Sequence, residues 1–208
     1  ASFLAQTHRD WVLYWRDDGS SDGTVALVDA FARGPASGRV VPLPAPEGRR
    51  GAVESFMRLL RAALATEPDA GALAFADQDD VWLPEKLARG RDALARVPAQ
   101  TPALYCARQI LVDERLRRIG LSFPISHAPG FPAALAQNVA TGCTVMLNRA
   151  AGALIAASEP PPATMHDWWS YLLIAAAGGL LLPDDTPVVL YRQHAGNLVG
   201  APSTLPRR

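Results

Sequence analysis

Cysteine is scarce in this chain, because only Cys106 and Cys143 occur among its 208 residues. Two cysteines cannot build the disulfide framework on which many small secreted proteins depend, so we expect a reducing cytoplasm. Lysine is scarcer still, since Lys86 is the only lysine among the 20 basic residues. An excess of either charge is also missing, because 20 acidic residues balance the basic ones. A neutral chain has no general attraction to nucleic acid or to anionic lipid.

Long apolar runs are missing as well. The longest one, Leu172 to Leu182, is too short to span a bilayer and is interrupted by Gly178 and Gly179. No signal peptide is recognisable at the first residues. We therefore expect a soluble protein without a transmembrane segment. A lipid-linked substrate would bring it to the inner face of the cell membrane as a peripheral contact.

The densest chemistry lies in the acidic segment Asp77-Gln78-Asp79-Asp80. It follows an apolar run over residues 70–76 that is typical of a buried strand. It precedes Leu83-Pro84-Glu85-Lys86, where a proline and an acid indicate a helix start. Strand, acidic turn and helix are the usual layout of a site at the carboxyl edge of an α/β sheet. Carboxylates this close repel one another unless a cation separates them, and hard oxygen ligands favour Mg²⁺ or Mn²⁺.

A second acidic turn has the same setting. Trp11 to Trp15 is rich in aromatic and β-branched residues and predicts a strand. Asp17-Asp18-Gly19-Ser20 follows it, and a helix-spaced apolar pattern begins at Val25. Strands and helices continue to alternate along the chain. This alternation predicts a three-layer α/β domain with a mainly parallel central sheet.

The chain length fits a single domain over residues 1–208, with about 195–208 as a loose tail. A chain of this size can bury roughly 70 % of its unfolded surface, so a conventional core is available. The expected strands cover residues 11–15, 39–43, 70–76, 102–106, 109–113, 143–147, 180–182 and 188–191. The expected helices cover residues 25–33, 51–65, 84–97, 148–157 and 165–177.

The two acidic turns and three later segments, in this order, resemble the inverting family-two glycosyltransferases with the A-type (GT-A) fold. The likeness is greatest to bacterial rhamnosyltransferase-like members. It covers about the whole chain, and the central acidic motif is its most specific part. The residues that carry it are Asp17-Asp18-Gly19-Ser20-Ser21-Asp22-Gly23-Thr24, Asp77-Gln78-Asp79-Asp80-Val81-Trp82-Leu83-Pro84-Glu85-Lys86-Leu87, Thr141-Gly142-Cys143, His166-Asp167-Trp168-Trp169 and Tyr191-Arg192-Gln193-His194.

The resemblance implies a metal-dependent enzyme of surface polysaccharide synthesis. It would move a sugar from a nucleotide diphosphate sugar, with dTDP-rhamnose as the candidate, to a hydroxyl of a saccharide or lipid-linked saccharide. Asp17 and Asp18 would lie at the donor, where Asp18 accepts a hydrogen bond from a base N–H. Asp77 would hold the ribose, and Arg192 would reach the diphosphate.

The same resemblance implies the metal ligands and the acceptor side. Asp79 would bind Mn²⁺ or Mg²⁺ with Asp80 and His194 beside it, and the ion would neutralise charge on the leaving diphosphate. Asp167 would take the proton from the acceptor hydroxyl, so a single displacement inverts the sugar. The implied acceptor contacts are Trp168, Trp169 and Gly142. Adjacent residues of a helix point about 100° apart, so at most one of the two tryptophans faces a ligand.

Ordinary structural roles compete with these assignments. The segment Asp77 to Asp80 could cap the helix that follows it, and Asp17-Asp18 is a common turn sequence. Asp167 could act only as a helix cap, because an acid at a helix start is frequent. A single histidine after a strand, such as His194, is more often structural than a ligand. The two cysteines have the character of small buried hydrophobes and receive no chemistry.

Two other functions remain open. Family members begin with a strand and a helix that would lie before Ala1, so we expect this chain to lack that strand and most of that helix. Such a chain could be an inactive or binding-only relative, since a missing strand leaves a sheet edge exposed. A nucleotidyltransferase on a similar sheet is the second enzyme class. It would carry a glycine-rich basic phosphate loop early in the chain, where Asp17-Asp18-Gly19 is acidic.

Overall fold

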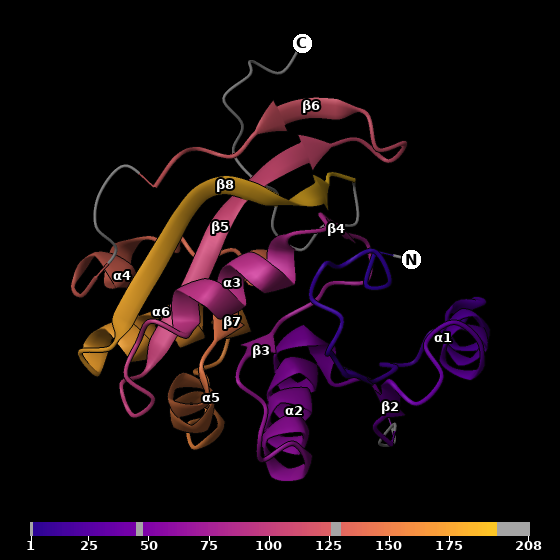
Figure 1. Ribbon diagram of the computed structural model, residues 1–208, viewed down its shortest axis with the longest axis horizontal. Helices are drawn as coiled ribbons and strands as arrows, with labels where there is room; N and C mark the ends of the chain where they lie inside the picture. The colour runs from indigo at the N-terminus through magenta and orange to yellow at the C-terminus, as the bar shows by residue number, and fades with distance from the viewer. Residues whose placement is uncertain (1, 45–47, 126–129, 195–208) are drawn as a thin grey trace.

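The computed structural model describes residues 2–44, 48–125 and 130–194 (Figure 1). The tail that we predict over 195–208 lies outside these residues. The strands are β1 Leu13–Trp15, β2 Val40–Pro42, β3 Leu73–Ala74, β4 Val81–Trp82, β5 Ala103–Val112, β6 Arg118–Leu121, β7 Met146–Leu147 and β8 Leu180–Arg192. The helices are α1 Thr24–Arg33, α2 Gly51–Thr66, α3 Lys86–Leu94, α4 Ala133–Ala136, α5 Arg149–Ala156 and α6 His166–Ala176, with a 3₁₀ turn η1 at Gly142–Thr144.

The strands form two sheets. β1 and β2 pair with each other in parallel, and the main sheet has the order β3-β7-β5-β8-β4 with β6 added to β5. The predicted α/β class is confirmed, but the expectation of mainly parallel pairing is wrong. Among the described strands only β1–β2 and β5–β8 are parallel. The antiparallel pairing of β6 with β5 follows from their connection, because a tight turn can join only antiparallel strands.

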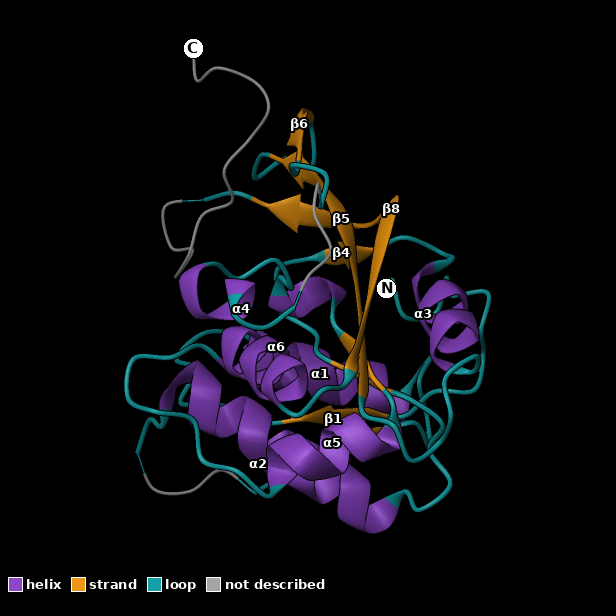
Figure 2. Ribbon diagram, turned by 90° about the vertical axis from the view of Figure 1, so that its left-hand side faces the viewer, coloured by secondary structure: helices purple, strands orange, loops and turns teal. Residues whose placement is uncertain are grey.

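Helices cover both faces of the main sheet, which confirms three layers (Figure 2). Side chains of β5 alternate between the faces, with Leu104 and Cys106 in one core and Tyr105 and Ala107 in the other. The first core contains apolar residues of α2, α5 and α6, namely Met57, Leu60, Ile155 and Ile174. The second contains Leu87 and Leu94 of α3.

The sequence predicts breaks between strands at residues 107–108 and 183–187. Both breaks are absent, and β5 and β8 are instead long continuous strands that pair in parallel. The proline-containing segment Pro183 to Pro187 predicted a break in β8. Instead the register shifts there, so that Ala107 faces Asp184 and Arg108 faces Pro187. A second shift follows, because Gln109 faces Val189, and the three extra residues of β8 form an irregular bulge in which Asp184 Oδ1 accepts a hydrogen bond from the Thr186 N–H at 2.8 Å. A proline has no backbone N–H to donate to the neighbouring strand, so Pro183 and Pro187 are compatible with an irregular part of the pairing.

Other predicted elements are shorter than expected. The strand expected over 70–76 is only β3, extended by one hydrogen bond of 3.3 Å from the Phe75 N–H to the Val145 carbonyl. The helix expected over 84–97 is α3, and the strand expected over 143–147 is divided into η1 and β7. The short elements β4 and α4 were not expected from the sequence. Part of the loop predicted over 123–132 lies outside the described residues.

A large cavity separates the two sheets. Within the described part of the chain, β1 pairs only with β2, and β3 pairs only with β7. A space of about 2190 Å³ lies between them, lined by Leu13 of β1, Phe56 of α2 and Leu73 of β3. Helix α1, which lies at this end of the molecule, has no buried residue (Figure 1). The candidate site opens into this cavity.

Candidate functional site

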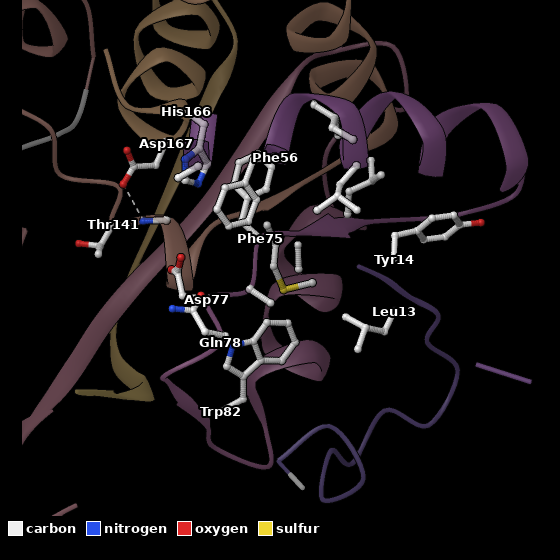
Figure 3. A pocket seen from close by; sticks show the side chains of 18 of the residues that line it. Leu13, Tyr14, Phe56, Phe75, Asp77, Gln78, Trp82, Thr141, His166 and Asp167 are labelled. Atoms are coloured by element: carbon white, nitrogen blue, oxygen red, sulfur yellow. Dashed lines mark hydrogen bonds between the residues drawn. The ribbon is translucent and has the colours of Figure 1, made fainter. Parts of the chain in front are cut away.

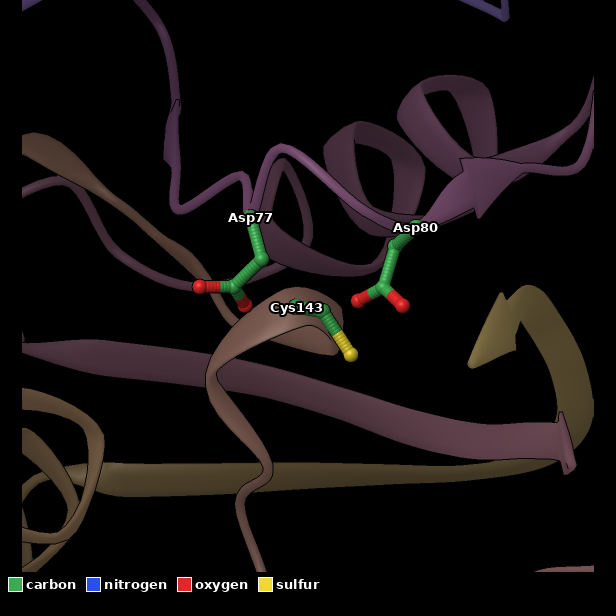
Figure 4. Close-up of side chains that lie close together, drawn as sticks. All are labelled: Asp77, Asp80 and Cys143. Carbon is green, nitrogen blue, oxygen red and sulfur yellow. The ribbon is translucent and has the colours of Figure 1, made fainter. Parts of the chain in front are cut away.

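The acidic turn meets η1 in a cluster of three potential ligands. One ligand atom each of Asp77, Asp80 and Cys143 lies within 4.8 Å of the others (Figure 4). Burial raises the pKa of Asp77 to about 7, and repulsion from Asp80 and Asp79 adds to the shift. Burial also raises the pKa of Asp80 to about 6, although a hydrogen bond from the Arg192 N–H opposes it. Full ionisation of the carboxyl groups of this turn is therefore unfavourable unless a cation is present.

Lys86 supplies one positive charge beside this cluster. Its side chain is fully buried, and Nζ lies 3.4 Å from the centroid of the Trp82 ring. Burial lowers the pKa of Lys86 to about 7, while Cys143, Asp77 and Asp80 raise it. The sequence reasoning gave Lys86 no role. The sequence feature that distinguishes Lys86 is that it is the single lysine in a chain that otherwise uses arginine.

The carboxylates of the cluster fit a hard divalent cation. The Oδ2 atom of Asp80 is buried and has no hydrogen-bond partner among the described residues. Such an atom is costly to bury unless an ion or a donor satisfies it. Cys143 does not suit Mg²⁺ or Mn²⁺, because burial raises the pKa of its thiol well above the ordinary value and soft ligands favour other metals. Sequence reasoning gave Cys143 no chemistry, and the structure makes it a neighbour of the acids.

The end of β8 lies against the acidic turn. His194 Nε2 and Asp79 Oδ2 are 2.8 Å apart. The Arg192 N–H donates to Asp80 Oδ1 at 3.1 Å, and Arg192 Nε donates to the Asp79 carbonyl at 2.9 Å. Pairing of β4 with β8, in which Val81 faces Leu190, produces this contact. The structure thus brings together two segments that are more than 100 residues apart, as the hydrogen bonds from Arg192 illustrate.

Asp167 lines the same cavity, on the same side as Asp77 in Figure 3. It is the second residue of α6, and its two oxygens accept different backbone hydrogen bonds. Oδ2 accepts from the Gly142 N–H at 2.8 Å, and Oδ1 accepts from the Trp168 N–H at 2.6 Å. Burial raises the pKa of Asp167, and these two N–H groups oppose the shift. A carboxylate with a raised pKa is better suited to take up a proton.

His166 forms the wall beside Asp167, a position that the sequence reasoning did not single out. Its ring stacks on Phe56 with centroids 3.9 Å apart and meets Phe75 edge-on at 4.9 Å (Figure 3). Both ring nitrogens are buried without a hydrogen-bond partner among the described residues. Burial lowers the pKa of His166 to about 3, so the ring is neutral at physiological pH. The sequence feature that could have identified His166 is its position directly before Asp167 in the His-Asp-Trp-Trp segment.

The two tryptophans of α6 diverge, as adjacent helical residues must. Trp168 lines the cavity, and its Nε1 donates to the Ala134 carbonyl at 2.7 Å. Trp169 Nε1 instead donates to Ser158 Oγ at 2.8 Å, and Trp169 is not among the described residues that line the cavity. Only Trp168 is therefore positioned to contact a ligand in this cavity.

Gly142 allows close approach between η1 and α6. A Cβ atom at this position would lie 3.2 Å from His166 Nε2 and 3.4 Å from Asp167 Oδ2. A side chain here would push against His166 and Asp167 in the adjoining wall of the cavity.

The first acidic turn has a structural role in the fold. Asp18 accepts hydrogen bonds from the backbone N–H groups of Arg50 at 2.8 Å and Gly51 at 2.7 Å, where α2 begins. Arg16 Nη1 lies 2.9 Å from Asp18 Oδ1. Asp17 accepts from the N–H groups of its own turn. Asp18 still lines the cavity, whereas Asp17 is not among the described residues that do so.

One cavity therefore joins most of the predicted site residues. Its described lining includes Asp18, Asp77, Asp79, Gly142, Asp167, Trp168 and His194. Asp80 and Arg192 lie next to it through the hydrogen bonds of the acidic turn. No described helix is both long enough and apolar enough to cross a membrane.

Comparison with known families agrees with this arrangement. The profile described as Glycosyl transferase family 2 matches residues 1–128, which is more than half of the chain and contains both acidic turns. No curated protein matches the chain. The chain belongs to the family-two glycosyltransferases.

Proposed function

We propose that this protein transfers a sugar from a nucleotide diphosphate sugar to a saccharide hydroxyl, with inversion at the sugar carbon. The observation that carries the proposal is that Asp167 and Asp77 line the same cavity, from α6 and from the acidic turn. A base and a donor-binding group that line one cavity are what a single displacement needs.

Asp167 is the proposed general base. It would accept the proton of the acceptor hydroxyl while that oxygen attacks the sugar carbon, so no protein nucleophile is required. Its backbone hydrogen bonds from Gly142 and Trp168 support the role, because they hold the carboxylate in one orientation. The contact of Trp168 with the cavity supports a stacking role against a sugar face.

The proposed metal ligands are Asp79, Asp80 and His194. Mg²⁺ or Mn²⁺ bound there would neutralise the charge that develops on the leaving diphosphate. The 2.8 Å pair of Asp79 and His194 supports two members of this set, and Oδ2 of Asp80, which has no partner among the described residues, supports the third, although the cluster within 4.8 Å joins Asp80 to Asp77 and Cys143 instead. Asp77 is proposed to contact the ribose, and Arg192 to help hold the diphosphate.

The finer assignments follow from the resemblance. We propose dTDP-rhamnose as the donor and a saccharide or lipid-linked saccharide of a surface polysaccharide as the acceptor. The resemblance places Asp17 and Asp18 at the nucleotide base and Gly142 and Trp169 near the acceptor; Asp17 and Trp169 are not among the described residues that line the cavity, so we propose these contacts for Asp18 and Gly142. Asp18 could bind a base only if it shared its carboxylate with the α2 N–H groups that it already accepts. The proposed setting is the cytoplasm, at the inner face of the cell membrane.

Calorimetry and a transfer assay together test the function. Thymidine or uridine diphosphate should bind in the presence of Mn²⁺, and the nucleotide diphosphate should be released from the sugar donor when an acceptor is added. Absence of nucleotide binding by a folded sample would contradict the proposal.

A relative without transfer activity, inactive or binding-only, is the second candidate, and the engagement of Asp18 by α2 favours it because this carboxylate is already occupied. In that case nucleotide would bind with Mn²⁺, but no donor would be consumed with any acceptor. The nucleotidyltransferase alternative has no observation in its favour.

A further inference from the structure

The hairpin that joins β5 to β6 projects from the body of the protein. It stands at the edge of the main sheet, away from α2 and α5 (Figure 2). Residues 114–119 form an unbroken exposed stretch with the sequence Glu-Arg-Leu-Arg-Arg-Ile. Leu116 and Ile119 are 41 % and 42 % exposed, and Phe123, just after β6, is 53 % exposed. Large apolar side chains this exposed are unusual at the tip of a hairpin, where polar residues predominate.

The tip is held in a defined conformation. Asp113 accepts hydrogen bonds from the N–H groups of Arg115 and Arg117, both at 2.9 Å. The Leu116 N–H donates to the Asp113 carbonyl at 2.9 Å, and Leu116 has a φ of 62°. This left-handed conformation is uncommon for a residue with a branched apolar side chain. The backbone thus keeps Leu116 at the exposed apex instead of folding it back.

The hairpin also has a small positive charge, because Arg115, Arg117 and Arg118 outnumber Asp113 and Glu114. Arg117 forms an ion pair of 2.7 Å with Asp113. No ion pair of Arg115 or Arg118 occurs with any residue that the structure describes, and both are exposed. The chain is neutral as a whole, so this local concentration of arginine is not visible in the net charge.

We propose that this hairpin docks the protein on the surface of an anionic phospholipid bilayer. Leu116 and Ile119 would enter the boundary between head groups and acyl chains, and Arg115 and Arg118 would contact the lipid phosphates. Apolar anchors combined with adjacent cations give such a surface both insertion and electrostatic attraction. The exposed arginines oppose a basic partner surface.

The hairpin is connected directly to the candidate site. Arg192 Nη1 donates to the Glu114 carbonyl in the hairpin, while Arg192 Nε donates to the Asp79 carbonyl in the acidic turn. Ser122 and Phe123, which follow β6, line the cavity, so a bilayer that holds the hairpin would lie beside it. This placement suits an acceptor sugar carried on a lipid, and in that respect the inference extends the proposed function.

Vesicle sedimentation without any substrate tests the docking. The protein should sediment with vesicles of phosphatidylglycerol and phosphatidylcholine in equal parts and remain in solution with phosphatidylcholine alone. The double variant Arg115→Gln, Arg118→Gln should bind the anionic vesicles about 25-fold more weakly, at about fivefold for each charge. The double variant Leu116→Ser, Ile119→Ser should also bind the anionic vesicles more weakly. This difference from the unaltered protein should persist at high salt, because it comes from apolar insertion.

The matched control is the double variant Arg33→Gln, Leu180→Ser. The Arg33 side chain is 77 % exposed and Leu180 is 43 % exposed, and both lie outside the hairpin. Its vesicle binding should equal that of the unaltered protein. Failure of the unaltered protein to bind anionic vesicles, or equal binding by the hairpin variants, would overturn the docking proposal. Sugar transfer to a water-soluble acceptor would survive that result, so the two proposals fail separately.

Discussion

The backbone N–H of Gly142 donates a hydrogen bond of 2.8 Å to Asp167 Oδ2, and this contact joins two segments that are 25 residues apart. It ties η1, which also carries Cys143 of the acidic cluster, to the start of α6. The proposed base and the proposed metal site therefore share one structural support. A shift of η1 would move both.

Replacement of Asp167 by asparagine should abolish turnover and preserve donor binding. The amide oxygen can still accept from the Gly142 N–H, but the side chain cannot take up a proton. We expect the rate of transfer to fall by about 100-fold to 10 000-fold. Transfer assays and nucleotide calorimetry on the same sample measure both effects. The matched control Asp29→Asn on α1 should change neither, and normal transfer by Asp167→Asn would refute the base assignment.

Replacement of Gly142 by alanine should lower transfer through displacement of Asp167. The new methyl group would lie 3.2 Å from His166 Nε2, so the wall must shift. We expect a loss of about 1–3 kcal/mol in the free energy of unfolding and a decrease of about tenfold to 100-fold in transfer. Denaturant unfolding and kinetics measure these quantities. Gly23→Ala, where a Cβ atom meets nothing within 4 Å, is the control, and equal behaviour of the two variants would contradict the role of Gly142.

Replacement of Asp79 by alanine should remove the Mn²⁺ dependence of nucleotide binding. The change deletes one proposed ligand and also leaves His194 without its 2.8 Å partner. We expect binding measured with Mn²⁺ to fall at least tenfold, toward the level measured with a chelator. Calorimetric titrations with and without Mn²⁺ provide the test. An unchanged response to Mn²⁺ would exclude Asp79 as a ligand.

The stability of the metal-free protein should fall as pH rises from about 4 to about 7. Asp77 has an ordinary value of 3.8 and a raised pKa of about 7 in the folded state. In this range the folded state holds a proton that the unfolded state has lost, so raising the pH favours unfolding. Above pH 7 the lowered pKa of Lys86 acts in the opposite sense, because the unfolded state then binds more protons.

Thermal unfolding in the presence of a chelator measures this dependence. The midpoint should decrease by several degrees between pH 4.5 and pH 7. Asp77→Asn should reduce the slope, since an amide does not titrate and only Asp80, whose pKa is raised to about 6, then contributes to the fall, and Asp29→Asn should leave the slope unchanged. A midpoint that rises over this range in the unaltered protein would show that Asp77 is ionised in the folded state.

Replacement of His166 by phenylalanine should stabilise the fold. Phenylalanine can retain the stack on Phe56, and it removes two buried nitrogens that have no partner among the described residues. We expect a gain of about 1 kcal/mol in the free energy of unfolding. Urea denaturation measures it. A loss of stability would show that the nitrogens are satisfied in solution, for example by water.

Local sequence patterns were sufficient for most of the elements. The apolar periodicity of α2 and the acid-bearing turns after β1 and β3 predicted helices and strands close to those observed. The patterns failed where long-range pairing overrides local preference. Pro183 and Pro187 predicted a break, but the pairing of β8 along all of β5 absorbs them in a bulge.

The sequence by itself determined the family, the alternation of strands and helices, and the identity of the acids available for chemistry. Only the tertiary structure decided how those acids are used. Asp18 is engaged by the first N–H groups of α2, whereas Asp77 and Asp80 meet Cys143 and the buried Lys86. These contacts depend on how distant segments pack and on strand register, and a local pattern specifies neither.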